Sequence, residues 1–578
     1  MLSIFLPING SLAQNQLLQH QQQLLIDVHA VASDHHSSII QDFRKPRSVV
    51  FCAMMGGSSH VNWVLATLQE LNNRGHSTTF IARDDHIMFG KKYPAINGIS
   101  VGSPYFPKEE MNTVMKELRS KPPIKAYVEL LEGIGRYFVE DYLALLKIFE
   151  VNKFDLVICD HFTLVCNEVA IKLGLPFVVT SSIPYGDDAS APYVNNHILS
   201  QEHPTTLKLS LWQRINDLFI KPLQFLYYQR HYIRERGKLM TALGLEPSWK
   251  PEAKWADALK VFNTGFGFTP PRPMSPLVEL VGPIVTNIQS KLTPELEDFL
   301  QRHQKVAYVA FGQTAVCVKK DIQLILTGLL EAYEAKEIDG IIWSTRNLKD
   351  EFPDFITLQG SNTTYDIRAI LSASSSLTTT TISSSNKESN THSKDFRFLN
   401  WLPQMAILRH ASTAIFVTHG GSNSISEAMY AGTRIVVYPF FGDQPGNART
   451  AEKNGIGLRV SAKEHSLEQA IGIIRRVARD DRGYFQANVD RMKVLVQLRS
   501  KHGVTKAADL AEEVMFMQIG GKLPHRRDVK RDMFWWKAYN VDIYSILVLS
   551  VMMIIWLVRG CFLYLQRSNY TNTKLKSL

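Results

Sequence analysis

Polar and glycine residues with the chemistry of an anion site follow a short apolar run in the C-terminal half of the chain. Residues 414–418 (AIFVT) are apolar and β-branched, which predicts a buried parallel strand. A His-Gly-Gly turn beginning at His419 follows at once, and a helical pattern then runs as far as Gly432. A strand, a glycine turn and a helix start aim free backbone N–H groups and the positive helix end at a ligand, which favours a phosphate.

A second polar loop leaves the neighbouring strand of the same predicted sheet. Residues 434–438 (RIVVY) predict that strand, and Asp443 and Gln444 follow it. Open α/β sheets bind ligands at the carboxyl ends of their strands, so both loops are expected to face one ligand. For the His-Gly-Gly turn alone, an ordinary strand–turn–helix with a glycine cap would be the preferred interpretation.

Residues 398–447 as a whole resemble the signature stretch of the UDP-glycosyltransferases, the family of plant small-molecule glucosyltransferases and animal glucuronosyltransferases. The resemblance rests on several residue types that stand together at the family's spacing. It implies an aromatic face for uracil, two side chains for the ribose, donors for the diphosphate, and two side chains for the sugar hydroxyls. In that order the residues are Trp401; Gln404 and Glu427; His419, Gly421, Asn423 and Ser424; and Asp443 and Gln444.

Two further polar residues follow predicted strands of a βαβ pattern in the N-terminal half. Residues 48–55 predict a strand, and His60 stands after the glycine turn that follows it. Residues 154–159 predict another strand, with Asp160 directly after it. A lone His there is more often structural, and an Asp is often a helix N-cap. The resemblance instead makes His60 the catalytic base and Asp160 the carboxylate that orients it, on one rim of one sheet.

The resemblance also implies the fold, which is α/β with two Rossmann-like domains facing across a cleft (GT-B type). Residues 305–311 (KVAYVAF) predict the first strand of the second domain. The family usually has Ser after the glycine that follows this strand. Gln313 stands there instead, so we expect Thr314 to supply the phosphate contact.

Composition shifts divide the chain into segments. The N-terminal segment combines a weak signal sequence, which lacks a basic start, with a glutamine-rich run. A Ser/Thr-rich stretch inside the second domain predicts a disordered insertion without chemistry. The predicted segments are residues 1–45 (N-terminal segment), 46–270 (acceptor domain), 271–290 (linker), 291–520 (donor domain, with the insertion at 361–394), 521–542 (juxtamembrane), 543–565 (transmembrane helix) and 566–578 (basic tail).

Composition and charge exclude some functions. The 578 residues are 45% hydrophobic and 20% charged, which is typical of a globular protein. The net charge of +10 is spread along the chain without a recognition motif, so nucleic acid is not an expected partner. The five cysteines form no CxxC motif or His/Cys cluster, so no metal is expected, and neither Cys159 nor Cys166 is given a partner.

The C-terminal apolar stretch is long enough to cross a bilayer. Residues 543–558 and their continuation to Leu565 follow an aromatic belt at Trp535 and Trp536. Basic residues flank both ends, so charge alone leaves the orientation open. The resemblance implies a single-pass protein of the endoplasmic reticulum with a lumenal catalytic part, in contact with membrane lipid through this helix.

Residues 185–260 are rich in aromatic and basic residues. Aromatic residues at helical spacing are mostly core, and that is the expectation here. An apolar acceptor pocket or a surface lying on lipid are the alternatives. The aromatic residues are Trp212, Phe219, Phe225, Tyr227, Tyr228 and Tyr232.

These features predict inverting transfer of a hexosyl group from a UDP-sugar to a hydroxyl of a small, apolar acceptor. His60 would remove the acceptor proton, and the helix after His419 would stabilise the departing diphosphate, without a metal or cofactor. A catalytically silent UDP-sugar-binding partner subunit is one alternative, although the intact His60 and Asp160 argue against it. A sterol or lipid glycosyltransferase is the other, and the sugar stays open.

Overall fold

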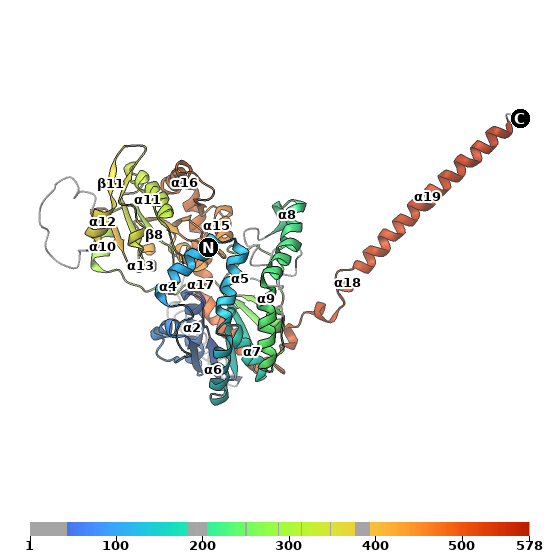
Figure 1. The fold of residues 1–578 in the computed structure, drawn as a ribbon, viewed down its shortest axis with the longest axis horizontal. Coiled ribbons are helices and arrows are strands. Elements are labelled where there is room, and N and C mark those ends of the chain that lie inside the picture. Colours follow the sequence, from blue (N-terminus) through green and yellow to red (C-terminus); the bar gives the residue numbers. More distant parts are fainter. Residues whose placement is uncertain are drawn as a thin grey trace, which may run out of the picture.

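Short apolar runs form the strands of two parallel sheets, which build the two lobes of the globular part (Figure 1). A parallel sheet covered on both faces buries every strand side chain, so its strands read as continuous apolar runs. The structure is a computed structural model of the 578-residue chain. It describes residues 43–182, 191, 193–194, 205–248, 251–286, 288–313, 315–346, 348–375 and 394–576, so the predicted signal segment and Thr314 lie outside the described residues.

The first sheet has its strands in the order β3-β2-β1-β4-β5-β6-β7, all parallel. This is the doubly wound order, in which the chain builds outward from β1 and then continues from β4 on the other side. The direction of winding therefore reverses between β1 and β4. The strands are β1 (Ser48–Cys52), β2 (Ser77–Ala82), β3 (Asn97–Ser100), β4 (Leu156–Asp160), β5 (Phe177–Ser181), β6 (Leu259–Phe262) and β7 (Val278–Leu280).

The second sheet repeats this winding in the order β12-β9-β8-β13-β14-β15, again all parallel. Its reversal lies between β8 and β13. A two-stranded antiparallel hairpin, β10 with β11, stands apart. The strands are β8 (Val306–Ala310), β9 (Gly340–Ser344), β10 (Phe355–Thr357), β11 (Thr364–Asp366), β12 (Phe396–Leu399), β13 (Thr413–Thr418), β14 (Arg434–Val437) and β15 (Gly457–Arg459).

Helices connect the strands of each sheet. Those of the first unit are α2 (Ser58–Asn73), α3 (Asp84–Ile87), η1 (Met88–Lys92), α4 (Lys108–Ser120), α5 (Pro123–Gly135), α6 (Phe138–Val151), α7 (Leu164–Lys172), η3 (Thr206–Lys208), α8 (Leu211–Ile215), η4 (Asn216–Ile220), α9 (Lys221–Ala242) and η5 (Pro251–Trp255). Those of the second are α10 (Pro294–Arg302), α11 (Lys319–Glu334), η6 (Lys349–Glu351), α12 (Ile367–Ser375), α13 (Gln404–Arg409), α14 (Ser422–Ala431), α15 (Gln444–Lys453), α16 (Leu467–Arg479) and α17 (Tyr484–Met517).

Strand side chains alternate between two apolar cores in each unit. In β1, Val49 and Phe51 belong to one core, whereas Val50 and Cys52 belong to the other. The strands of the second sheet divide between its two cores in the same way. Full burial of such side chains stabilises the fold by about 1.5–3 kcal/mol each. The sheets are therefore held from both faces, and only their ends can carry polar function.

Helix α17 joins the two units. Val489 and Val496, in its first part, pack in a core of the second sheet. Ala508 and Leu510, near its end, pack in a core of the first sheet. The prediction placed all of residues 291–520 in the donor domain. The end of that range instead packs against the N-terminal unit, because α17 crosses back to it.

Glu512 fixes the crossing part of α17 to the first unit. Its carboxylate accepts hydrogen bonds from Arg44 (2.7 Å) and Arg74 (2.6 Å) and lies 3.1 Å from the His76 ring nitrogen. Burial acts to raise the pKa of Glu512, but the hydrogen bonds from His76, Arg44 and Arg74 lower it to about 2. The charged carboxylate is therefore the stable form at neutral pH.

The predicted insertion at residues 361–394 is partly wrong. Residues 364–366 form β11, and α12 follows. Tyr365 and Ile367 are buried in a core of the second sheet, and that burial holds this part of the segment in place. Residues 376–393 lie outside the described residues.

The aromatic residues predicted as core are mostly exposed, so that expectation is wrong for them. Trp212, Phe219 and Tyr227 are 67%, 58% and 60% exposed, and Tyr228 is also exposed. Phe225 instead stacks on Tyr127 at 5.9 Å between ring centroids, and Tyr232 packs against Gly135. Helix α9 has one inward face, so its aromatic residues cannot all be buried.

The cysteines also differ from expectation. Cys159 and Cys166 form a disulfide, with 5.7 Å between their Cα atoms. This pair could not be predicted from sequence, because the bond depends on how the end of β4 turns into α7. Among the described residues, Cys52 and Cys317 are buried free thiols and Cys561 is exposed.

One described helix is long and apolar enough to cross a membrane. It lies within α19 (Val541–Lys576), over Val541–Arg567, with a mean hydropathy of 2.4 and no burial against the rest of the protein. It contains the predicted span of residues 543–565. Figure 1 shows α19 projecting away from the globular part, after the short helix α18 (Trp535–Ala538).

We expect Glu512→Gln to lower the free energy of unfolding by about 2–4 kcal/mol at neutral pH, because the partly buried Arg44 and Arg74 lose the counter-charge that they share. A carboxylate with a depressed pKa stabilises above its unfolded value and loses that contribution as pH falls through its folded value. The difference between wild type and variant should therefore shrink from about pH 4.5 down to about pH 2. Urea unfolding of both proteins at several pH values measures this difference in free energy. A difference that does not change with pH would contradict the stabilising role of the Glu512 carboxylate.

Candidate functional site

The predicted site residues stand at the two points where the sheets reverse their winding. His60 follows β1 and Asp160 ends β4, the two strands at the reversal of the first sheet. Gln313 follows β8 and His419 follows β13, the corresponding strands of the second. Loops on either side of such a reversal diverge and leave a crevice at the carboxyl ends, where open α/β sheets bind ligands.

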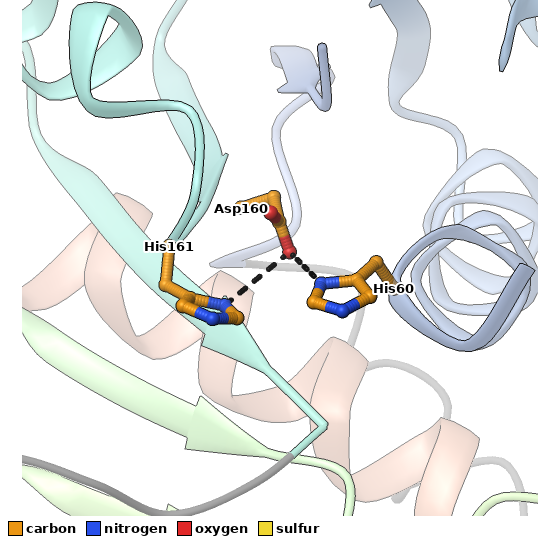
Figure 2. A group of neighbouring side chains, drawn as sticks. All are labelled: His60, Asp160 and His161. Atoms are coloured by element: carbon orange, nitrogen blue, oxygen red, sulfur yellow. Dashed lines mark hydrogen bonds and ion pairs between the residues drawn. The ribbon is translucent and has the colours of Figure 1, made fainter. Parts of the chain in front are cut away.

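His60 and Asp160 are in direct contact. His60 Nδ1 lies 2.9 Å from Asp160 Oδ2, and the Asp160 side chain is fully buried. Asp160 Oδ1 accepts the backbone N–H of Phe162 at 3.1 Å. The His161 imidazole lies 3.6 Å from Asp160 and stacks on His60 with 5.2 Å between ring centroids. Figure 2 shows both imidazoles beside the one carboxylate.

The electrostatics of this cluster favour a charged Asp160 and a basic His60. Burial acts to raise the pKa of Asp160, but the charges of His60 and His161 hold it well below its usual value. Burial acts to lower the pKa of His60, but the charge and hydrogen bond of Asp160 raise it overall, with a further contribution from Asp443. For His161 burial prevails, and its pKa is lowered. The two imidazoles therefore differ in basicity, and His60 is the better proton acceptor.

A glycine turn places His60 at the first turn of α2. Gly56 has a φ of +100°, which favours glycine, and a Cβ there would lie 2.6 Å from the His60 ring. The His60 backbone N–H donates to Gly57 O at 3.0 Å. The turn thus lets the imidazole lie against the backbone and reach Asp160 on the neighbouring strand.

The His419 turn in the second unit has the predicted form. β13 ends at Thr418, Gly421 is the N-cap of α14, and Asn423 and Ser424 lie in the first helical turn. The predicted stop is confirmed as well, since Gly432 caps α14 in the left-handed region at φ 92°. Free N–H groups of α14 therefore point toward the crevice.

The surroundings of His419 keep it neutral. A Cβ at Gly312 would lie 2.7 Å from its ring, so this glycine leaves room for the imidazole. Burial, with the charge of Arg346 second, lowers the pKa of His419 to about 4. A neutral imidazole can donate one hydrogen bond to a phosphate oxygen without competing for a proton.

Gln404 and Glu427, both predicted to hold the ribose, form one hydrogen-bonded group with Ser424, which was predicted to contact the diphosphate. Gln404 Nε2 donates to Glu427 Oε2 at 2.6 Å and lies 3.3 Å from Ser424 Oγ. Burial raises the pKa of Glu427 to about 7, although the hydrogen bond from Gln404 acts to lower it. The carboxyl therefore titrates close to neutrality.

Trp401 stands exposed at the mouth of this group. Its side chain is 66% exposed, and the Arg346 guanidinium lies over the ring at 5.8 Å from its centroid. Arg346 also donates to the backbone oxygen of Gly312. Sequence reasoning missed Arg346, although its position directly after the apolar run at residues 341–345 could have indicated it.

The loop at Asp443 faces the crevice. Asp443 Oδ2 accepts a hydrogen bond from Asn447 Nδ2 at 2.7 Å, and Asn447 also donates to Gly420 O at 2.9 Å. Gln444 is buried, and its side-chain oxygen accepts the backbone N–H groups of Phe440 and Phe441 at 2.8 and 3.2 Å. Asp443 therefore lies beside the crevice, whereas the Gln444 side-chain oxygen is already hydrogen-bonded within the turn.

Contacts across the crevice bring the two predicted sites together. The side-chain oxygen of Gln313 accepts the backbone N–H of Ser58 at 3.2 Å, at the start of the helix that carries His60. Ser422 Oγ lies 3.5 Å from Ser182 O. The charge of Asp443 also acts to raise the pKa of His60. The acid–base pair and the anion-binding turn therefore face each other.

The cluster around Asp160 could also ligate a metal ion. Ligand atoms of His60, Asp160 and His161 lie within 4.8 Å of one another. However, His60 Nδ1 already lies at hydrogen-bond distance from the carboxylate, and Asp160 Oδ1 accepts a backbone N–H. These contacts favour a hydrogen-bonded pair over a metal site.

Two facing Rossmann-like units with these loops at their reversals have the GT-B fold, as predicted. The crystal structure of the glycotransferase of kitacinnamycin matches with a TM-score of 0.55 and 16% sequence identity, over 81% of this chain and 99% of that one. CalG4, the calicheamicin glycosyltransferase, matches with a TM-score of 0.50 and 16% identity, over 81% and 98%.

The chain belongs to the UDP-glucuronosyl and UDP-glucosyl transferase family. The profile described as "UDP-glucoronosyl and UDP-glucosyl transferase" matches residues 48–576. A UDP-glycosyltransferase of Talaromyces amestolkiae is 26% identical over 84% of this chain and 91% of its own length. UDP-glucuronosyltransferase 2B7 of Homo sapiens is 22% identical over 88% and 91%. The protein is thus an enzyme that transfers a sugar from a UDP-sugar.

We expect His60→Ala to lower transfer by about 10²–10⁴-fold, the usual loss of a general base, without changing UDP affinity. Asp160→Asn removes the charge that raises the pKa of His60. The acidic limb of kcat/KM should therefore move to lower pH, because His60 accepts a proton only when neutral. UDP release measured across pH tests both variants. An unmoved limb in Asp160→Asn, or turnover like wild type in His60→Ala, would contradict the assignment.

We expect Glu427→Ala to weaken UDP binding by about 1.5–3 kcal/mol, the usual value for hydrogen bonds to a charged group. Wild-type UDP affinity should rise as pH increases through about 7, because the carboxylate then forms. In the matched control Asp443→Asn, UDP should bind normally while UDP-sugar turnover falls. Calorimetric titration measures both. Unchanged UDP affinity in Glu427→Ala would show that the ribose is held elsewhere.

Proposed function

We propose that the protein transfers a hexosyl group from a UDP-sugar to a hydroxyl of a small, apolar acceptor, with inversion at the anomeric carbon. The observation that carries this proposal is the 2.9 Å contact between His60 and Asp160, placed opposite the His419 turn. A base on one side of a crevice and an anion site on the other suit direct in-line displacement. The silent-subunit alternative would have no use for this pair.

In the proposed step, His60 Nε2 takes the proton of the acceptor hydroxyl. The acceptor oxygen forms its bond to the anomeric carbon while the bond from that carbon to the diphosphate oxygen breaks. Asp160 stabilises the imidazolium that results, as a buried carboxylate does when it holds the far side of the ring. UDP leaves with the electron pair and its added negative charge.

The donor is proposed to lie along α14. The diphosphate takes the N–H groups at Gly421 and the side chains of His419, Asn423 and Ser424, where preorganised dipoles meet developing charge. The ribose lies on Gln404 and Glu427, the uracil on Trp401, and the sugar hydroxyls on Asp443 and the amide end of Gln444. Arg346 is proposed as an additional cation for the diphosphate, because its charge acts to lower the pKa of His419.

The cofactor requirement is proposed to be nil. The cation role that a metal ion would play at the diphosphate falls to Arg346 and the α14 N-terminus in this scheme. Both lie in the second unit, on the donor side of the crevice. Activity should therefore not depend on a divalent ion.

The location is proposed to be the endoplasmic reticulum, with the globular part in the lumen and α19 in the membrane. The Cys159–Cys166 disulfide supports a lumenal position, because such bonds persist in oxidising compartments. A membrane location also suits a lipophilic acceptor, which partitions into the bilayer. A sterol or lipid glycosyltransferase, with a membrane lipid as acceptor, stays the alternative.

The test measures UDP release by the detergent-purified full chain with a panel of UDP-sugars and of phenol, sterol and water-soluble alcohol acceptors. We expect turnover with one sugar and with apolar acceptors, undiminished by a chelator, and a product of opposite anomeric configuration by NMR. Retained configuration would reject direct displacement, and loss of activity with chelator would reject the metal-free scheme. UDP-sugar binding without any turnover would favour the silent subunit.

A further inference from the structure

The structure points to a second membrane contact: we propose that the exposed face of α8–η4–α9 lies on the surface of the bilayer that α19 crosses. The face is defined by Leu211, Trp212, Leu218, Phe219, Leu223 and Tyr227, all of which are exposed. The inference rests on α19 being inserted in that bilayer.

The spacing of these residues produces one apolar stripe. Steps of seven residues lead from Leu211 to Leu218 and from Trp212 to Phe219, and steps of four lead on to Leu223 and Tyr227. Such steps return to one side of an α-helix, although η4, over Asn216–Ile220, is a π-helix with a longer period. All six side chains are exposed, so the described part of the protein does not cover them.

The charge of the segment suits lipid headgroups. Between residues 205 and 242, seven Lys and Arg stand against Asp217 and Glu235. Asp217 is already paired with Lys221 at 2.6 Å, and Glu235 with Lys238 at 2.8 Å. An apolar face with Trp and Tyr beside excess cations is the pattern of a helix in the interface of an anionic membrane.

The anchor keeps this unit close to the bilayer. Arg531 Nη2 donates to Ala256 O at 2.6 Å, and Arg526 pairs with Glu279 at 2.9 Å, so the juxtamembrane segment is bound to the first unit. The nine residues 532–540 then lead from Arg531 to Val541. Even fully extended they reach only about 32 Å. In the view of Figure 1, α8 and α9 form the edge of the globular part on the side of α18 and α19.

The occupant that this geometry favours is therefore lipid. A second copy of the chain would need a matching apolar face in a tethered orientation, whereas the bilayer lies within reach of every copy. The contact would also bring the first unit, which carries His60, against the phase in which apolar acceptors dissolve.

The test uses the full chain in vesicles of phosphatidylcholine with phosphatidylserine. Phe219→Cys carries an environment-sensitive fluorophore, in a Cys561→Ala background that removes the exposed free thiol. Val151→Cys, at the end of α6 and also exposed, is the matched control. Resistance of the protein to carbonate extraction reports insertion of α19 separately.

We expect blue-shifted emission and quenching by doxyl-labelled lipid at position 219, stronger with more phosphatidylserine, and neither effect at position 151. Equal, water-like emission at both positions in carbonate-resistant protein would overturn the proposal. Shielded emission at 219 without doxyl quenching would also overturn it, since protein and not lipid would then cover the face. Loss of transfer activity in other variants bears on the proposed function and leaves this readout untouched.

Discussion

The site depends on one constraint, which is that the carboxyl edges of two separate sheets must face each other. Helix α17 meets this constraint by packing Val496 into the core of the second sheet and Leu510 into that of the first. The buried Glu512 then binds the end of the helix to Arg44 and Arg74. Because apolar packing and ion pairs act on the same helix, the two edges cannot separate freely without exposing a core or an unpaired charge.

Two histidines in the crevice have different pKa values because their surroundings differ. His60 and His419 both follow strands at a winding reversal, but Asp160 raises the pKa of one while burial lowers that of the other. The first is therefore the stronger base, and the second is held neutral, so that it interacts through hydrogen bonds. A charge partner on the adjacent strand therefore separates base chemistry from anion binding in one crevice.

Much of this could be predicted from sequence, because buried parallel strands read as apolar runs and polar residues after them must lie at one edge. That reasoning placed His60, Asp160, His419 and Asp443 at the ends of strands, and the family resemblance then suggested their roles. It missed what depends on three-dimensional packing: the Cys159–Cys166 bond, the burial of Tyr365 within the predicted insertion, and the return of α17 to the first unit. It also misassigned the aromatic residues of α8 and α9, because helical periodicity shows that a face is apolar but not what covers it.

Gln313 shows how a departure from a family pattern can be understood physically. A serine at this position has one short hydroxyl, whereas the longer glutamine side chain reaches across the crevice to the Ser58 N–H. That N–H is one of the free donors at the start of α2, so the contact satisfies a group that the helix leaves unpaired. The residue that follows β8 thereby links the donor-side loop to the helix that carries His60. The departure therefore places a contact between the two units at this position.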